Sequence, residues 1–348
     1  MGVPYRLDSC VWEITLACCF SCAYCGSRAG KARADELSTE ECLDVARQLA
    51  DLGCQRVSLI GGEIFLRKDW VQIAQALTSR NVDVAIITNG FLFTEEHIRK
   101  LKEARIESVA VSIDGPGRLH DKYRQEGSFD RALRAIEVLS SAGILVSVIT
   151  TLNAENALTL EDLYETLRTR RIFAWQIQAC SPMGNAASTG IDYRFDFQRV
   201  IGFVRDHAGA APFKIGIADN IGYFTEEETL VRGGSAVFPG CGAGLSGIGI
   251  DSVGNVRGCE SMYDARFIEG NLRSRTLADI WNDPQAFSYN RAFDPTKLTG
   301  ACASCPYGSR CAAGCRSYNY FVHDKLYESP FCARKGAVKK ADSEKKVN

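Results

Sequence analysis

Residues 56–115 read RVSLIGGEIFLRKDWVQIAQALTSRNVDVAIITNGFLFTEEHIRKLKEARIESVAVSIDG. Three runs within this segment are rich in Val and Ile, namely RVSLIGG (56–62), DVAIITNG (83–90) and SVAVSIDG (108–115). Such near-continuous apolar runs are typical of parallel strands that are buried on both faces. The segments between them place apolar residues at helical spacing. The alternation therefore predicts consecutive βα units, with right-handed crossovers, in one parallel sheet.

The same pattern continues on both sides of this segment. Three more strands are predicted, at VWEITLA (11–17), LVSVITTLN (145–153) and AWQIQ (174–178). Amphipathic helices are predicted between the strands, from a capping box at Ser38 and Glu41 to Gly53, and over about 69–80, 94–104, 128–142 and 159–170. Six βα units are too few for a closed eight-stranded barrel. The sequence therefore predicts an α/β fold with a partial (β/α)6 barrel over residues 1–207, whose functional residues follow the carboxyl ends of the strands.

The rest of the chain is organised differently. Residues 208–240 are predicted to form a bridging region, and GIGIDSVGNVRG (247–258) is predicted to form a hairpin that turns at Gly254 and Asn255. Residues 241–335 are rich in loops and cysteine, and we expect them to form a separate module. Residues 336–348 are highly charged, which predicts a disordered tail.

Composition limits the classes of partner. The chain carries 41 basic and 42 acidic residues, a net charge of −1, so its total charge does not favour nucleic acid or an anionic membrane. No apolar run approaches the roughly 20 residues that span a bilayer, and the first residues do not resemble a signal peptide. We therefore expect a cytoplasmic protein that binds neither nucleic acid nor membrane.

Fifteen cysteines are unusual for a chain of this kind. In a reducing compartment, dense cysteine indicates metal or redox chemistry rather than a disulfide framework. Cys42, Cys54 and Cys180 fall in or next to predicted helices or strands, where cysteine is usually a small buried apolar residue. The other twelve form one group near the amino end and a second group of seven from Cys241 to Cys332.

The first group contains the motif C-x3-C-x2-C, formed by Cys18, Cys22 and Cys25 directly after the first predicted strand. Three thiolates can hold three irons of a [4Fe–4S] cluster and leave the fourth iron open for a ligand. A zinc knuckle is the alternative, although zinc sites favour paired cysteines and tetrahedral closure. Cys19 breaks the ligand spacing and is predicted to be a spectator, whereas Cys10 lies outside the motif and is predicted to be structural.

This motif resembles that of the radical S-adenosylmethionine (SAM) superfamily. The resemblance implies that SAM binds the open iron of a catalytic [4Fe–4S] cluster. It also implies that one-electron reduction yields a 5′-deoxyadenosyl radical, which abstracts hydrogen from a substrate. Tyr24 matches the aromatic residue that lies next to the adenine in that family, and Gly61, Gly62 and Glu63 match the GGE motif that binds the SAM amino group. Ile64 replaces the proline that usually follows.

The resemblance implies further SAM contacts at later strand ends. Ser112 and Asp114 match the SxDG segment of the family, and Asn89 follows the third strand. Arg124 is a candidate partner for a carboxylate, with a solvated loop arginine as the alternative. Gln176, or Gln178 on the same strand, is a candidate contact of SAM or the substrate, with a satisfied polar position inside the barrel as the alternative.

The distal cysteines resemble the seven-cysteine SPASM extension found on one branch of this superfamily, and every spacing fits. The resemblance implies two auxiliary iron–sulfur clusters, of which the first is fully ligated by Cys302, Cys305, Cys311 and Cys332. Cys241, Cys259 and Cys315 hold the other, with its fourth iron either bound by a non-cysteine ligand or open to substrate. A zinc ribbon is the alternative, although seven cysteines are one short of two all-cysteine zinc sites.

The SPASM branch mostly modifies peptides and proteins, so the leading expectation is an oxidoreductase that matures a ribosomally made peptide or protein. Only seventeen residues precede Cys18, which leaves either a separate leader-binding protein or a substrate without a leader. A flavodoxin or ferredoxin is the expected electron donor. One alternative is a SPASM enzyme that acts on a small molecule such as a tetrapyrrole side chain. Another is a non-catalytic iron–sulfur or zinc protein.

Overall fold

The computed structural model describes residues 4–234 and 238–334. The tail predicted at 336–348 lies outside this part of the chain. A single ten-stranded sheet organises the structure, in the order β10-β9-β8-β1-β2-β3-β4-β5-β6-β7. Its strands are β1 Ser9–Glu13, β2 Arg56–Ile60, β3 Asp83–Thr88, β4 Ser108–Ser112, β5 Leu145–Leu152, β6 Ala174–Ala179, β7 Lys214–Ile217, β8 Gly247–Ile250, β9 Asn255–Arg257 and β10 Gly270–Asn271.

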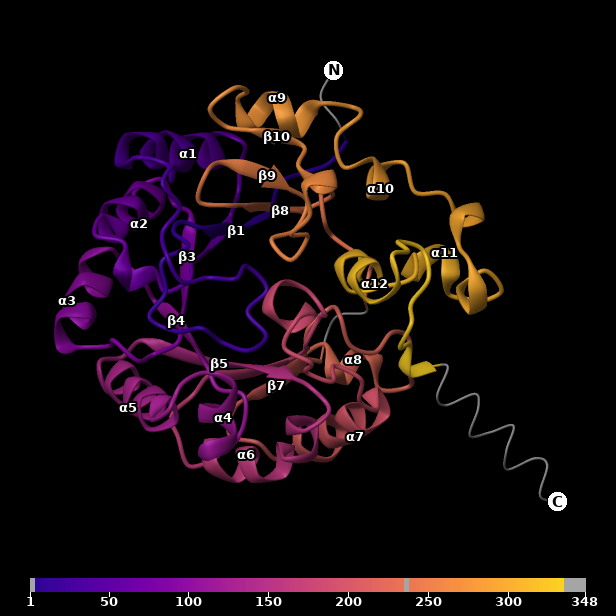
Figure 1. Cartoon of the computed structure of the whole chain (residues 1–348), viewed down its shortest axis with the longest axis horizontal. Coiled ribbons are helices and arrows are strands. Elements are labelled where there is room, and N and C mark those ends of the chain that lie inside the picture. Colours follow the sequence, from indigo (N-terminus) through magenta and orange to yellow (C-terminus); the bar gives the residue numbers. More distant parts are fainter. Residues whose placement is uncertain (1–3, 235–237, 335–348) are drawn as a thin grey trace.

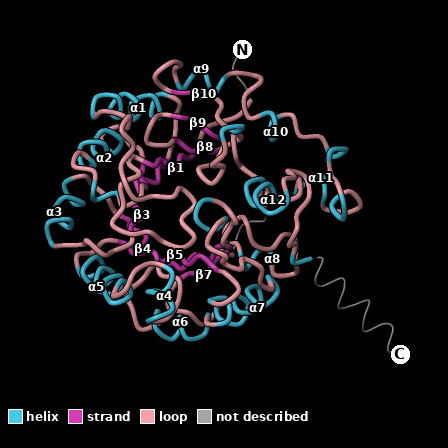
Figure 2. Tube along the Cα trace, in the orientation of Figure 1, coloured by secondary structure: helices cyan, strands magenta, loops and turns pink. Residues whose placement is uncertain are grey.

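Helices cover the outside of the strands (Figure 1). Those that follow the parallel strands are α1 Thr39–Asp51, α2 Trp70–Thr78, α3 Glu95–Glu103, α4 Arg118–Tyr123, α5 Ser128–Ser141, α6 Leu160–Leu167, α7 Phe197–His207 and α8 Glu228–Val231. The short helices α9 Leu277–Asn282, α10 Ser288–Arg291, α11 Gly308–Cys311 and α12 Arg316–His323 belong to the cysteine-rich region. That region lies beside the barrel and is built mostly of loops (Figure 2).

The six predicted parallel strands are present, and β1 to β6 pair in chain order. The predicted fold class, an α/β partial barrel, is confirmed. The predicted capping box also begins α1, because Ser38 and Glu41 each accept a bond from the other's backbone N–H. The predicted hairpin is formed by β8 and β9, which pair antiparallel around Gly254 (φ +86°).

The sheet extends beyond the six strands at both ends. On one side, β7 pairs in parallel with β6, although its residues lie in the predicted bridging region. On the other side, β8 pairs in parallel with β1, with Cys10 opposite Ile248. Strands on both sides of the predicted boundaries at 207 and 240 therefore belong to one continuous sheet.

The two faces of the strands differ, contrary to the prediction that both are buried. On β2, Val57 and Leu59 are fully buried, whereas the alternate residue Ser58 faces an internal cavity. On β6, Trp175 and Ile177 are buried, and Gln176 faces the cavity. Small and polar residues on the inner face keep the centre of the barrel open. No helix in residues 4–234 or 238–334 is long and apolar enough to cross a bilayer.

Candidate active site

A cavity of about 1330 Å³ occupies the inside of the barrel. Residues from each of the first six parallel strands line it. Both cysteine-rich parts of the chain also reach its wall, through Cys18, Cys22 and Cys25 at the amino end and through Cys259 and Cys315 in the distal region. The cavity thus brings together residues that are more than 200 positions apart.

The first cysteine motif lies on the loop between β1 and α1. Its three cysteines line the cavity, and none of the cysteines in the described ranges forms a disulfide. Asn185 holds this loop, because its side-chain amide donates to the Cys22 carbonyl (2.8 Å) and its backbone N–H donates to the Cys25 carbonyl (2.9 Å). Burial raises the pKa of the Cys22 thiol to about 11, although the Arg124 charge opposes this rise. Three unpaired thiols on one loop fit a cluster with an open iron.

The end of β2 packs directly against the start of this loop. A Cβ atom at Gly62 would lie 2.4 Å from the Ala17 carbonyl oxygen and one at Gly61 would lie 2.8 Å from the Thr15 carbonyl oxygen. Both positions therefore need glycine, because any side chain would push the two segments apart. Both glycines line the cavity.

Glu63 is placed differently from the two glycines. It is 1% exposed and does not belong to the cavity wall. One carboxylate oxygen accepts a bond from the Thr88 hydroxyl (2.8 Å), and the other accepts one from the Asn89 backbone N–H (2.9 Å). Burial raises the pKa of this carboxyl to about 7. Glu63 therefore fixes the end of β3, where the Asn89 side chain reaches the cavity.

Tyr24, Asp114 and Arg124 form a buried cluster beside the cysteine loop. Asp114 is fully buried and accepts bonds from the Tyr24 hydroxyl, from Arg124 Nε and, at 2.8 Å, from the Thr151 backbone N–H. Burial alone would raise the pKa of Asp114, but the Arg124 charge and these bonds hold it below its ordinary value. Tyr24 and Arg124 line the cavity, whereas Asp114 stands behind them.

The remaining predicted contacts all reach the cavity. Asn89, Ser112 and Gln176 line it, and so does Gln178, whose amide donates to the Thr151 hydroxyl (3.0 Å). The Asn89 amide also lies 3.5 Å from Cys19 Sγ, a contact that joins the end of β3 to the cysteine loop.

His120 gives the protein a predicted pH dependence. Its Nδ1 accepts a bond from the Asp114 backbone N–H (3.1 Å), and its buried Nε2 has no partner among the residues described. Burial, assisted by the Arg124 charge, lowers the pKa of His120 to about 4. Because the unfolded chain binds a proton near pH 6.5 and the folded chain does not, this group's contribution to stability is present above pH 6.5 and is lost as the pH falls toward 4. We expect a loss of about 1.4 kcal/mol between pH 7.5 and 5.5.

Anaerobic urea unfolding at these two pH values measures this loss, and the variant His120→Asn is the comparison because it has no titrating ring. Equal pH dependence of the unfolding free energy in both proteins would contradict the assignment.

The distal cysteines form two sets in space. Cys241, Cys259 and Cys315 act electrostatically on one another, and burial raises the pKa of the Cys259 thiol to about 12. Cys311 interacts electrostatically in the same way with Cys302, Cys305 and Cys332. Across the described ranges, no three His, Cys, Asp or Glu side chains converge closely enough to hold a single metal ion. A cluster needs no such convergence, because each thiolate binds a different iron.

Several residues of the cavity wall were missed by the sequence analysis. Asp219 and Asn220 follow β7, and their position after a strand in an alternating α/β pattern is the signal that could have identified them. Glu260 follows Cys259, and neither of its buried carboxylate oxygens has a hydrogen-bond partner among the described residues. Nothing in the local sequence identified it.

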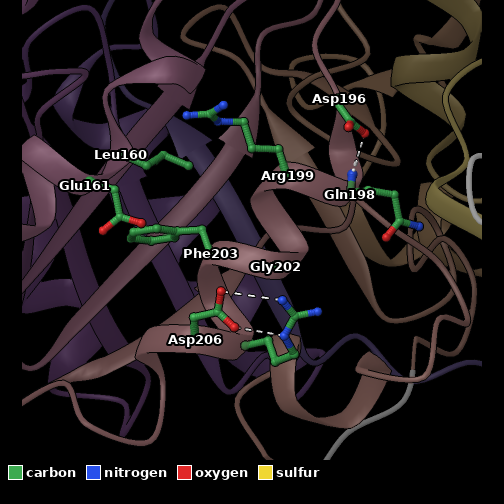
Figure 3. Close-up of a pocket in the computed structure, with 9 residues that line it drawn as sticks. Leu160, Glu161, Asp196, Gln198, Arg199, Gly202, Phe203 and Asp206 are labelled. Carbon is green, nitrogen blue, oxygen red and sulfur yellow. Dashed lines mark hydrogen bonds and ion pairs between the residues drawn. The ribbon is translucent and has the colours of Figure 1, made fainter.

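A smaller recess of about 440 Å³ lies on the outside of the barrel, between α6 and α7 (Figure 3). Glu161 lies on one side of it and Arg199 and Asp206 on the other. It contains none of the cysteines and is separate from the central cavity.

Comparison with known proteins agrees with this arrangement. Residues 12–167 match the radical SAM superfamily, and residues 241–306 match SPASM, an iron–sulfur cluster-binding domain. Mycofactocin maturase MftC of Mycolicibacterium smegmatis is 30% identical over 315 residues, which cover 89% of this chain and 78% of the relative. The AdoMet-dependent heme synthase of Methanosarcina barkeri is 29% identical over 336 residues, which cover 92% of this chain and 95% of the relative.

Among solved structures, SuiB of Streptococcus suis bound to S-adenosylmethionine has the same fold, with a TM-score of 0.77 at 18% identity over 94% of this chain and 77% of that chain. The protein is therefore an enzyme of the radical SAM superfamily, which uses SAM and a [4Fe–4S] cluster and carries a SPASM domain for auxiliary iron–sulfur clusters.

Proposed function

We propose that this enzyme matures a peptide or protein by oxidising one of its residues in the central cavity. Cys18, Cys22 and Cys25 hold the catalytic cluster in this proposal, and SAM bound there supplies the radical that removes a hydrogen atom from the substrate. The wall formed by Tyr24, Asn89, Ser112, Arg124 and Gln176 orients SAM. Gly61 and Gly62 have no side chains, so SAM can come close to the backbone at the end of β2.

The auxiliary clusters complete the proposal. Cys302, Cys305, Cys311 and Cys332 hold one cluster, and Cys241, Cys259 and Cys315 hold the other. Of these, Cys259 and Cys315 lie on the cavity wall. A substrate residue held in the cavity therefore lies between the two cysteine-rich regions, where an electron released by the substrate can be accepted nearby.

The size of the cavity is the observation that carries the peptide proposal. Its volume of about 1330 Å³ exceeds the roughly 300–1,000 Å³ of ordinary small-molecule sites. This leaves space for a peptide segment in addition to SAM and the catalytic cluster. The relatives also favour a peptide substrate, since MftC is a maturase and SuiB has also been solved with the precursor peptide SuiA.

Mass spectrometry tests this proposal. The enzyme is co-expressed with short peptides encoded beside its gene, and the expected product has lost two hydrogen atoms or gained a crosslink. The matched control is co-expression with Cys22→Ala, which should leave every peptide unchanged. If no peptide changes although the purified enzyme cleaves SAM, the peptide proposal fails.

The heme synthase relative supports a second candidate, oxidation of a tetrapyrrole side chain. It matches this chain over 95% of its own length. Incubation of the reduced enzyme with SAM and a propionate-bearing tetrapyrrole separates the two candidates. Substrate-dependent formation of 5′-deoxyadenosine with loss of carboxyl groups would favour the tetrapyrrole.

We expect Glu63→Gln to weaken SAM binding by about 1 kcal/mol, the difference between a hydrogen bond to a charged group and one to a neutral group. Glutamine can keep both contacts, because its amide donates to the Thr88 hydroxyl while its oxygen accepts from the Asn89 N–H, but the negative charge that strengthens the bonds at the end of β3 is lost. Anaerobic equilibrium dialysis with SAM measures the affinity, and the surface variant Glu165→Gln is the control. Unchanged affinity would show that the Glu63 charge does not contribute to SAM binding through the end of β3.

A further inference from the structure

Arg316 is a buried cation whose surroundings point to the auxiliary clusters. It begins α12 directly after Cys315, and its side chain is 0% exposed. Among the described residues it forms no ion pair with any carboxylate. Burying a guanidinium without a countercharge costs several kcal/mol, so this position requires negative charge from another source.

The bonds of Arg316 place it between the two sets of distal cysteines. Its Nη1 donates to the carbonyl of Ala312, which follows Cys311 of one set. Its Nε donates to the Asn290 side-chain oxygen (2.9 Å), and the amide of the same Asn290 donates to the Cys241 carbonyl of the other set (3.1 Å). The guanidinium is thus linked to the backbone of both sets.

Two aromatic rings and the backbone fix the position of the cation. The guanidinium lies 4.6 Å from the centre of the Tyr327 ring and 5.2 Å from that of Phe293. Its Nη1 also donates to the Leu326 carbonyl (2.9 Å), whereas its buried Nη2 has no hydrogen-bond partner in the part of the chain described. The two N–H donors of Nη2 therefore remain available to an acceptor.

The backbone that connects the two sets depends on this arrangement. Ala312 and Ala313, between Cys311 and Cys315, have positive φ angles of 51° and 66°, which are uncommon for alanine. Arg316 holds the carbonyl of Ala312, and Asn319 holds that of Ala313 (2.8 Å). The strained turn keeps the two sets close to the same cation.

We propose that Arg316 is the shared buried countercharge of the two auxiliary clusters and makes both of them easier to reduce. This inference rests on the proposed assignment of the distal cysteines. Each thiolate ligand brings negative charge, and reduction adds one more electron, so a fixed cation between the clusters stabilises the reduced forms most. Net charge and hydrogen bonds to the sulfurs are among the factors that set cluster potentials.

The test is an anaerobic redox titration of the intact, cluster-loaded enzyme, followed by EPR. In Arg316→Gln, we expect the equilibrium constant for one-electron reduction of each auxiliary cluster to fall at least tenfold, which corresponds to a midpoint potential about 59 mV lower. Arg316→Lys keeps the charge and should retain most of the wild-type potential. Arg67→Gln is the matched control, because Arg67 is a largely buried arginine that pairs with Asp69 (2.7 Å) and does not line the central cavity.

Each outcome decides the question. If Arg316→Gln keeps its clusters and its potentials do not change, the proposal is overturned. If this variant folds but loses its auxiliary clusters while Arg316→Lys keeps them, the charge is needed to hold the clusters and the proposal stands. If both variants lose them while Arg67→Gln does not, the role is one of shape rather than charge, and the proposal fails. A wild-type enzyme without auxiliary clusters would instead refute the cysteine assignment itself.

Discussion

The Cys22→Ala variant is expected to form no 5′-deoxyadenosine above background when the purified protein is reduced with dithionite and given SAM under anaerobic conditions. The substitution removes one of three thiols that share the loop between β1 and α1, and two thiolates hold a cluster poorly. We expect the rate to fall by at least ~10³-fold, because an enzymatic rate enhancement is lost as a whole when the reacting cofactor is not held. Chromatography with mass detection measures the product.

Cys42→Ala is the matched control for this experiment. Cys42 is also a free thiol but is fully buried in α1, away from the cavity wall. Its replacement should leave SAM cleavage within about twofold of wild type and remove no iron. Normal SAM cleavage by Cys22→Ala would show that the catalytic cluster does not depend on this motif.

Asp114→Ala is expected to destabilise the fold by about 3–5 kcal/mol, the cost of removing one partner of a buried ion pair. The variant leaves the Arg124 guanidinium buried without its carboxylate and removes the acceptor for the Tyr24 hydroxyl and the Thr151 N–H. Anaerobic urea unfolding measures the change in the free energy of unfolding.

The exposed pair of Arg168 and Glu165, 2.7 Å apart, provides the comparison. Glu165→Ala should change the free energy of unfolding by less than about 1 kcal/mol, because exposed ion pairs contribute little. A similarly small effect of Asp114→Ala would mean that the buried cluster does not stabilise the barrel.

The parallel part of the sheet could be predicted because each of its strands and helices has a pattern within its own short segment of sequence. Each of the strands β1 to β6 carries apolar residues at alternate positions, and each crossover carries its own helical pattern. By contrast, the pairing of β8 with β1 could not be read from the sequence. It joins GIGI (247–250) to a segment far away in the chain, and such glycine-rich runs carry little strand signal.

The candidate site also has a part that could be predicted from the sequence and a part that could not. Residues at strand ends, such as Asn89 and Ser112, could be placed near one another because parallel strands end on the same edge. The side-chain partners could not be placed. That Asp114 binds Tyr24, 90 positions away, and that Glu63 binds Thr88 behind the cavity wall, depend on packing between different loops. For the same reason, no local pattern indicated that Arg316 lies between two sets of cysteines.

The pairing of β8 with β1 also has a consequence for synthesis of the chain. Glu13 and Gly247 are 234 positions apart, so β1 emerges long before its second neighbour exists. At about 5–20 residues per second, translation leaves one edge of this strand open for roughly 10–50 seconds. An open edge can pair with the wrong partner. Early chaperone capture of the nascent chain should therefore raise the yield of well-folded material.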